Sequence, residues 1–172
     1  GFEWMEGIPG NLGGCLRMNA GAMGTQTFDQ VVSVRFINGN GDLQEKWKDE
    51  IKHAYRSVPE FDHNYAVSAV LQGRKADTPA IDARMAESHE HRRGSQPVGA
   101  SAGCIFKNPR EMPAGMLVEQ LQCKGRSRHA AIVSDVHGNF ILNSGGATAR
   151  DVLDLIADIK QAALQERGIT LE

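Results

Sequence analysis

The sequence predicts an α+β protein in which two modules follow one another along the chain. Segments of alternating apolar and polar residues gather in the first half, and a long amphipathic helical pattern lies near the C-terminal end. Between them, residues 94–103 are rich in glycine, serine and proline, which is typical of a boundary between modules. With 172 residues, of which 41% are hydrophobic, the chain is long enough for one or two compact domains with real cores.

The first module is expected to begin with a loop. Residues 7–24 contain six glycines and show no hydrophobic period, which indicates irregular backbone rather than a long helix or strand. A short helical turn is expected within it, at residues 12–18. Clustered glycines mark places where the backbone turns sharply or approaches another group closely.

Three strands are predicted to form one sheet in this module. Residues 31–37 (VVSVRFI) alternate and are rich in β-branched side chains. The sequence NGNGD at 38–42 predicts a tight turn, after which residues 43–47 return as a second strand. Residues 65–73 alternate again and are expected to join the same sheet, while residues 48–56 are predicted as a short helix.

A helix over residues 77–93 is predicted to link the modules. Pro79 stands near its start, where a missing backbone N–H costs nothing. The apolar residues on one face of this helix are Ile81, Met85 and Ala86. The two modules are therefore assigned to residues 1–93 and 94–172.

The second module is predicted to contain a helix over 113–121 and two strands, 130–135 and 139–143, joined by a tight turn. Residues 169–172 are predicted to begin another strand. The helix is expected to direct three side chains inward: Met116, Leu117 and Leu121.

The strongest helix prediction covers residues 145–168. Thr148 is a good N-cap, Asp151 three residues later completes a capping box, and Gly168 is the expected stop. One apolar stripe is formed by Val152, Ile156, Ile159 and Ala163.

Charge and hydropathy argue against two classes of partner. Nineteen basic and 21 acidic residues nearly cancel to a net charge of −2, so there is no electrostatic case for nucleic acid or an anionic membrane surface. No apolar run approaches the ~20 residues of a membrane span, and no signal peptide is recognised at the start. We therefore expect neither nucleic acid nor a membrane as a partner.

Cysteine and histidine usage predicts neither a disulfide framework nor a metal site. The three cysteines, Cys15, Cys104 and Cys123, are odd in number and widely spaced, which is typical of reduced thiols in the cytoplasm. No CxxC occurs. His89 and His91 lie two apart on a predicted helix, so their side chains face different directions and no metal is expected.

Three segments carry candidate chemistry, each with a structural alternative. The backbone amides of the 7–24 loop could cradle phosphate oxygens, although the loop matches neither of the common phosphate-binding glycine motifs. Arg56 in AYRS could bind a carboxylate or phosphate in two parallel hydrogen bonds, or form a surface ion pair. Cys104, placed in a loop with Lys107 and Asn108 close behind, could face a cavity or be a buried, inert thiol.

The order of these motifs resembles a known family. In sequence they read GIPGNLGGCLRMNAGAMG, YRS, SQPVGASAGCIFKNP, AGMLVEQLQCKG, VSDVHGNFILNSGGATARDVLDLI and GITLE. Together they closely resemble the UDP-N-acetylenolpyruvoylglucosamine reductases, and the resemblance runs nearly from residue 1 to residue 172.

The resemblance implies a fold and cofactors. Residues 1–93 would be the second part of an FAD-binding domain of the vanillyl-alcohol-oxidase type, and residues 94–172 a small α+β substrate-binding domain. The first FAD subdomain is expected to be absent, so this chain is expected to be an inactive fragment of an active parent. The short connection between YRS and SQP resembles the compact branch of the family.

The implied reaction makes UDP-N-acetylmuramate for peptidoglycan synthesis, and so for cell wall biogenesis, cell shape and cell division. NADPH would reduce FAD, and the flavin would deliver a hydride to the enolpyruvyl group of UDP-N-acetylglucosamine enolpyruvate. Arg56 would stabilise the resulting negative charge. Cys104 would donate the proton at the position where the family usually has serine, which is chemically sensible because a thiol with a pKa of ~8.5 is mostly protonated at neutral pH.

The resemblance also implies binding residues. The flavin would be contacted by Gly7, Ile8, Pro9, Gly10, Gly13, Gly14, Asn19, Ala20 and Gly21. The substrate would be bound by Tyr55, Arg92, Arg93, Lys107 and Asn108.

Three departures from the family pattern are expected. Glu172 matches the first of two carboxylates that the family commonly carries, and the second, catalytic one is expected to be absent from this chain. His129 stands in place of a glycine, and Met23 in place of tyrosine or histidine. An alternative interpretation is therefore a non-catalytic UDP-sugar-binding module of the same family, and the oligomeric state stays open.

Overall fold

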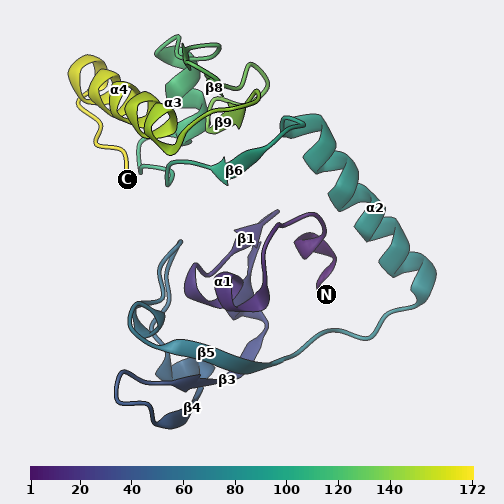
Figure 1. The fold of residues 1–172 in the computed structure, drawn as a ribbon. Coiled ribbons are helices and arrows are strands. Elements are labelled where there is room, and N and C mark those ends of the chain that lie inside the picture. The colour runs from purple at the N-terminus through teal and green to yellow at the C-terminus, as the bar shows by residue number, and fades with distance from the viewer. The chain divides into compact units, whose positions relative to one another are not determined.

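The computed structural model describes residues 1–172 and divides them into two compact units, Gly1–His91 and Arg92–Glu172. Helix α2 (Thr78–Ser95) runs through the division, two residues before the boundary expected at 93/94 (Figure 1). This helix confirms the one predicted over 77–93. None of the helices is both long enough and apolar enough to cross a lipid bilayer.

The first unit is built around a three-stranded antiparallel sheet. Its order is β4 (Leu43–Trp47), β3 (Val31–Ile37) and β5 (Tyr65–Leu71), which confirms the three predicted strands (Figure 1). The turn between β3 and β4 is held by Asn38, whose side-chain oxygen accepts the backbone N–H groups of Asn40 and Asp42 at 2.9 and 3.0 Å.

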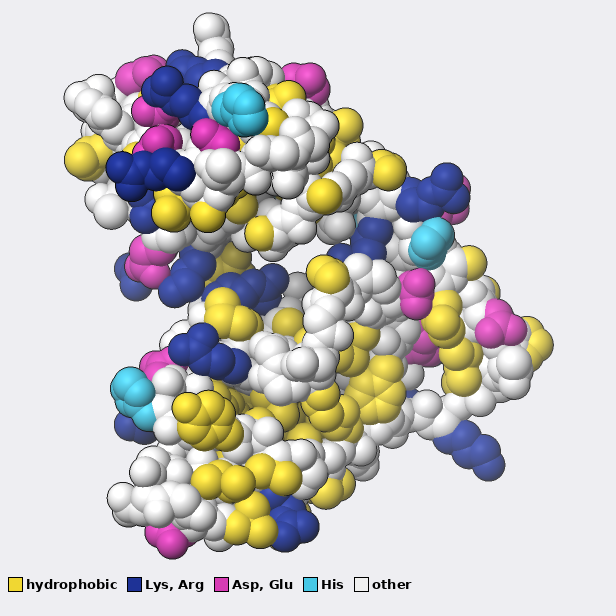
Figure 2. All heavy atoms as spheres, in the orientation of Figure 1, with side chains coloured by type: hydrophobic (Ala, Val, Ile, Leu, Met, Phe, Trp, Pro, Cys, Tyr) yellow, Lys and Arg dark blue, Asp and Glu magenta, His cyan; other side chains and the backbone are white.

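One face of this sheet covers the core of the unit, and the other is open. The core consists of Leu16, Phe28, Val31, Val34, Phe36, Ile51, Val58 and Phe61. On the open face, Ile37 is in register with both Leu43 and Tyr65, and the Tyr65 side chain is 76% exposed. Figure 2 shows hydrophobic side chains at the surface of this unit, while basic and acidic side chains are interspersed on both units.

Short elements surround the sheet of the first unit. They are η1 (Glu3–Met5), α1 (Leu12–Arg17), β1 (Gly21–Ala22), β2 (Thr25–Gln26), η2 (Thr27–Asp29), η3 (Lys48–Glu50) and η4 (Pro59–Phe61). Helix α1 confirms the helical turn predicted within the glycine-rich loop.

The helix predicted over 48–56 is wrong. Only Lys48–Glu50 form a single 3₁₀ turn, after which Ile51 is extended. The buried Ile51 and Val58 side chains both pack in the core, and between them Ala54 and Ser57 pair across a tight turn. Burial of both apolar ends outweighs the local helical preference of this segment.

The second unit contains a four-stranded antiparallel sheet and two helices. The strand order is β6 (Ser101–Cys104), β9 (Phe140–Asn143), β8 (Ala131–Val133) and β7 (Ser127–Arg128), and the helices are α3 (Ala114–Gln120) and α4 (Ala149–Arg167) (Figure 1). Strands β8 and β9 and both helices confirm the sequence prediction. The core lies between the sheet and the helices and contains Phe106, Leu117, Val118, Val133, Leu155 and Ile159.

Two parts of the second unit differ from the prediction. Strand β6 was not expected, because its small residues carry no alternating pattern, and it exists through its pairing with β9. Residues 169–172 form no strand, although Leu171 is buried and the Lys107 N–H donates to the Glu172 carbonyl oxygen at 3.1 Å.

Helix α4 begins and ends as its sequence predicts. The Thr148 hydroxyl accepts the Asp151 N–H at 3.2 Å, and the Asp151 carboxylate accepts the Thr148 N–H at 2.8 Å. Gly168 ends the helix with φ at +66°, a left-handed conformation that glycine adopts without strain. Ile159 and Ala163 of the predicted stripe are buried, and Leu155 joins them.

Helix α3 directs a different set of side chains inward from the one predicted. Ala114, Leu117, Val118 and Leu121 are buried, a helical spacing of three, four and seven residues. Met116, which was expected to point inward, is 54% exposed. The prediction was therefore wrong for Met116, because this residue does not lie on the helix face that these four residues define.

Leu117→Ala and Met116→Ala provide a matched test of this helix face. Leu117→Ala should lower the free energy of unfolding by about 2–5 kcal/mol, because it removes buried methyl groups and leaves a cavity. Met116→Ala should change it by only about 0.5 kcal/mol, as expected for an exposed site. Urea denaturation followed by far-UV circular dichroism measures both, and equal losses would contradict this packing.

Candidate functional site

Arg56 in the first unit is fixed against the glycine-rich segment. It lies in the tight turn between Ala54 and Ser57 with φ at +53°. Its two terminal nitrogens donate to the carbonyl oxygens of Asn19 at 3.2 Å and Gly21 at 3.0 Å. A guanidinium has five N–H donors, so these bonds orient the group and leave donors for an anion.

Asn19 holds this part of the first unit together. Its side chain is 1% exposed and donates to the Gln26 side chain at 2.9 Å and to the Ala54 carbonyl oxygen at 3.1 Å. Its side-chain oxygen accepts the Phe28 N–H at 3.1 Å. The amide is therefore used within the protein, and Asn19 joins the segment around Ala20 and Gly21 to the turn that carries Arg56.

The glycines singled out by the resemblance lie in two places. Gly7 and Gly10 are exposed in the run of residues that leads into α1, with Ile8 and Pro9 between them, and Gly13 and Gly14 are exposed in the first turn of α1 itself. Gly10 has φ at +112°, and open space surrounds the position that a Cβ would take. Gly21 lies in β1, where a Cβ would stand 2.7 Å from the Thr25 carbonyl oxygen, so that only glycine fits the β1–β2 hairpin.

In the second unit, Cys104 is the last residue of strand β6, rather than a loop residue as expected. It pairs with Phe140 of β9, and its side chain is exposed. The strand is irregular just before it, between Ser101 and Cys104, where Gly103 has φ at +80°. The alternative of a buried, inert thiol is therefore wrong for Cys104, whereas Cys15 and Cys123 are buried.

Lys107 is engaged by the last residue of the chain. Its ammonium lies 2.9 Å from the Glu172 carboxylate, and this contact lowers the pKa of that carboxyl. The neighbouring Asn108 accepts the Ala114 N–H at the start of α3, at 3.0 Å. Cys104 and Lys107 thus lie in one short segment of the second unit, and Glu172 contacts Lys107 from the C-terminal end of the chain.

The remaining substrate-binding candidates lie in the turn that carries Arg56 and at the end of α2. Tyr55 is exposed next to Arg56, with the guanidinium carbon 5.2 Å from its ring centre. Arg92 and Arg93 are in the last turn of α2, the first half-buried and the second exposed.

Comparison with known proteins decides the family. Residues 96–172 match the family described as UDP-N-acetylenolpyruvoylglucosamine reductase, C-terminal domain. A UDP-N-acetylenolpyruvoylglucosamine reductase of Syntrophus aciditrophicus is 39% identical over 173 residues, which cover all of this chain. The chain belongs to the UDP-N-acetylenolpyruvoylglucosamine reductase family.

Other members of the reductase family agree in fold and extent. The protein of the same name from Syntrophomonas wolfei is 41% identical across the whole chain. The crystal structure of the reductase from Thermus caldophilus superimposes on 99% of this chain with a TM-score of 0.88 at 33% identity. This chain spans 55% and 58% of the two curated relatives and 62% of the Thermus caldophilus chain.

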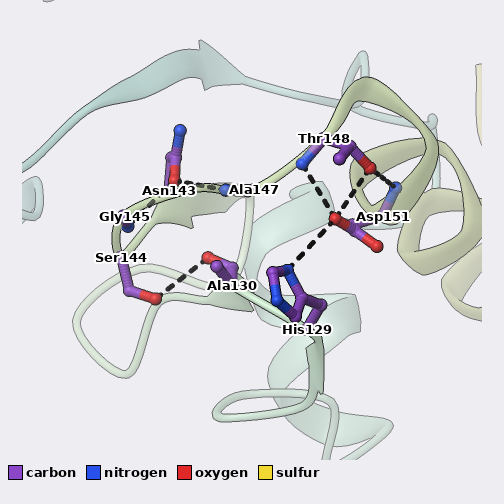
Figure 3. A network of polar contacts seen from close by, with 8 residues as sticks. All are labelled: His129, Ala130, Asn143, Ser144, Gly145, Ala147, Thr148 and Asp151. Carbon is purple, nitrogen blue, oxygen red and sulfur yellow. Dashed lines mark hydrogen bonds and ion pairs between the residues drawn. The ribbon is translucent and has the colours of Figure 1, made fainter.

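His129, a departure from the usual reductase pattern, takes part in a polar network at the start of α4 (Figure 3). Its Nδ1 lies 3.6 Å from the Asp151 carboxylate, whose pKa is lowered mainly by hydrogen bonds from Thr148 and further by His129. His129 has φ at +48°, the left-handed region that glycine adopts most readily. His129 thus adopts the backbone conformation that the glycine expected from the resemblance would take with least strain.

A second asparagine of structural importance, Asn139, lies in the segment that matches the reductase C-terminal domain, and no sequence pattern singles it out. Its N–H donates to the Nδ1 of His137 at 3.1 Å, and its side chain bonds twice to Phe106. The only local signal was a turn-forming HGN sequence, which gave no hint of a partner 33 residues away.

His137 should make the stability of the protein depend on pH. Burial lowers the pKa of His137 from its ordinary 6.5, and protonation of Nδ1 would abolish its bond from Asn139. Below pH 6.5 the unfolded chain binds more protons at this residue, so the free energy of unfolding should fall as pH decreases. Urea midpoints between pH 7.5 and pH 5 measure this fall.

His137→Asn is the matched control, because asparagine keeps a side-chain acceptor two residues before the Asn139 N–H but does not titrate. The variant should lose part of the pH dependence. An unchanged dependence would show that His137 is not its source.

Proposed function

We propose that the protein is an oxidoreductase that uses FAD and NADPH to reduce the enolpyruvyl group of UDP-N-acetylglucosamine enolpyruvate, giving UDP-N-acetylmuramate for peptidoglycan synthesis in the bacterial cytoplasm. The observation that carries the proposal is the exposed Cys104 thiol at the end of β6, within the segment that matches the reductase C-terminal domain. It occupies the position where the resemblance places the proton donor.

The proposal assigns residues 1–93 to the second part of an FAD-binding domain and residues 94–172 to the substrate-binding domain. The exposed glycines of residues 7–14 fit a cofactor that carries phosphates, since open space around Gly10 lets the backbone approach an anion closely. The resemblance places residues 19–21 against the flavin, and the Asn19 amide, which is used within the protein, would hold this backbone in place. A flavin bound there would pass a hydride to the substrate after it had accepted one from NADPH.

Cys104 acts as the general acid in this proposal. Hydride addition at one carbon of the double bond leaves negative charge on the substrate, and the thiol proton goes to the neighbouring carbon. The thiolate that remains regains a proton from water.

Arg56 stabilises the charge that forms on the substrate carboxylate. Its orientation is fixed in advance by the Asn19 and Gly21 carbonyl oxygens, so no reorganisation is needed as the charge develops. Tyr55, Arg92, Arg93, Lys107 and Asn108 are proposed to bind the substrate, with the cations suited to the UDP diphosphate.

The test uses the full-length protein. It should be yellow with the absorbance band of oxidised flavin, NADPH should bleach this band without oxygen, and the enolpyruvyl substrate should restore it. Mass spectrometry should show a product two hydrogens heavier than the substrate. A colourless protein that binds the UDP-sugar but does not react with NADPH would contradict the proposal and favour a non-catalytic binding module.

A further inference from the structure

We infer that Asn139 is a positioning residue for Cys104, which it acts on through the peptide groups that follow the thiol. The inference rests on the proposed function, because it concerns the group assigned there as the acid. Asn139 is 2% exposed and immediately precedes strand β9. It touches no substrate or cofactor group in this assignment.

Asn139 makes three hydrogen bonds to two consecutive residues. Its side-chain oxygen accepts the Phe106 N–H at 2.8 Å, and its side-chain nitrogen donates to the Phe106 carbonyl oxygen at 2.9 Å. Its own carbonyl oxygen accepts the Ile105 N–H at 2.9 Å. One residue thus fixes the backbone between Cys104 and Lys107.

This segment needs such a partner because regular pairing ends at Cys104. Strand β6 stops there, and the Phe106 side chain is buried in the core. Burial removes the Phe106 peptide from water, so an N–H or C=O left without a partner would be costly. The Asn139 amide presents a donor and an acceptor side by side, as a neighbouring strand would.

Asn139 is itself held rigidly. Its N–H donates to His137, and at the preceding Gly138 a Cβ would stand 2.6 Å from the Gly115 carbonyl oxygen. The turn that carries Asn139 is therefore tied to helix α3 as well as to Phe106. A shift of this turn would pass directly into the Ile105–Phe106 backbone and so to Cys104. Displacement of a reacting group by about 1 Å is enough to lower a rate about 100-fold.

The experiment compares Asn139→Ala with Asn143→Ala in the full-length protein. Asn143 is the matched control, because its side-chain oxygen also accepts two backbone N–H groups, those of Gly145 and Ala147 (Figure 3), but it serves a different loop. We expect Asn139→Ala to lower kcat about 10- to 100-fold with KM changed less than threefold and flavin content retained. Asn143→Ala should leave kcat within twofold.

A second measurement needs no turnover. The rate of iodoacetamide alkylation at Cys104, followed by peptide mass spectrometry, should change at least fivefold in Asn139→Ala and less than twofold in Asn143→Ala. The change should appear even if the wild-type protein reduces nothing. In that case the proposed function fails while the positioning of the thiol stands.

If Asn139→Ala does not fold, Asn139→Asp replaces it in the experiment. Aspartate keeps the shape of the side chain and the acceptor for the Phe106 N–H, but it loses the donor to the Phe106 carbonyl oxygen. It should show an intermediate change in Cys104 alkylation. Alkylation within twofold of wild type in a folded Asn139 variant, together with faster amide exchange at Phe106, would overturn the inference: the bonds would be broken without effect on the thiol.

Discussion

Cys104→Ala in the full-length protein is expected to lower kcat by about 10²- to 10⁴-fold, the usual contribution of a general acid. Flavin content and the rate of flavin reduction by NADPH should stay unchanged, since the role proposed for the thiol is limited to protonation of the substrate. Stopped-flow absorbance of the flavin separates the two half-reactions. Cys123→Ala is the control, because this buried thiol lies in the same unit but in its core.

Cys104→Ser distinguishes a proton donor from a group that merely fills space. The wild-type rate should fall as pH rises through the pKa of the thiol, because the thiolate cannot donate a proton. A serine hydroxyl stays protonated over the same range, so this alkaline limb should disappear while substantial activity remains. If the two pH–rate profiles coincided, Cys104 would not be the acid.

Arg56→Lys is expected to lower kcat by about 10²- to 10³-fold, as does the loss of one donor from an oxyanion site. Lysine keeps the charge but lacks the planar fork that reaches the Asn19 and Gly21 carbonyl oxygens together. Steady-state kinetics at saturating substrate measure the loss.

The control for Arg56 is Arg35→Lys, an exposed arginine on β3 in the same unit. It should leave kcat within about twofold. A rate for Arg56→Lys within threefold of wild type would show that the fork geometry is not needed, and that a single positive charge at this position is sufficient.

Local chemistry determined which elements were predictable. Strand β3 follows from its alternating β-branched residues, and helix α4 from Thr148, Asp151 and Gly168, whose capping bonds reach no farther than a few residues. Strand β6 and the segment after Glu50 depend on distant partners instead. Residues 101–104 become a strand only beside β9, and Ile51 is extended because it enters the core.

The same distinction between local signals and distant partners explains which residues of the candidate site could be predicted. Arg56 and Cys104 could be singled out because their motifs resemble those of the family. The resemblance assigns Asn19 only to the flavin, and no pattern assigns a role to Asn139, because asparagine in a loop ordinarily signals a turn. Their role lies in hydrogen bonds to residues 35 and 33 positions away, Ala54 and Phe106, which no local pattern reveals.

The exposure of Cys104 has a consequence for selective inhibition. Most members of the family are expected to carry serine here, and serine reacts poorly with mild electrophiles such as chloroacetamides. The other two thiols of this chain are buried, and burial raises the pKa of both Cys15 and Cys123, so they would react slowly. A covalent fragment directed at Cys104 would therefore discriminate this protein from serine-bearing reductases by the chemistry of one sulfur atom.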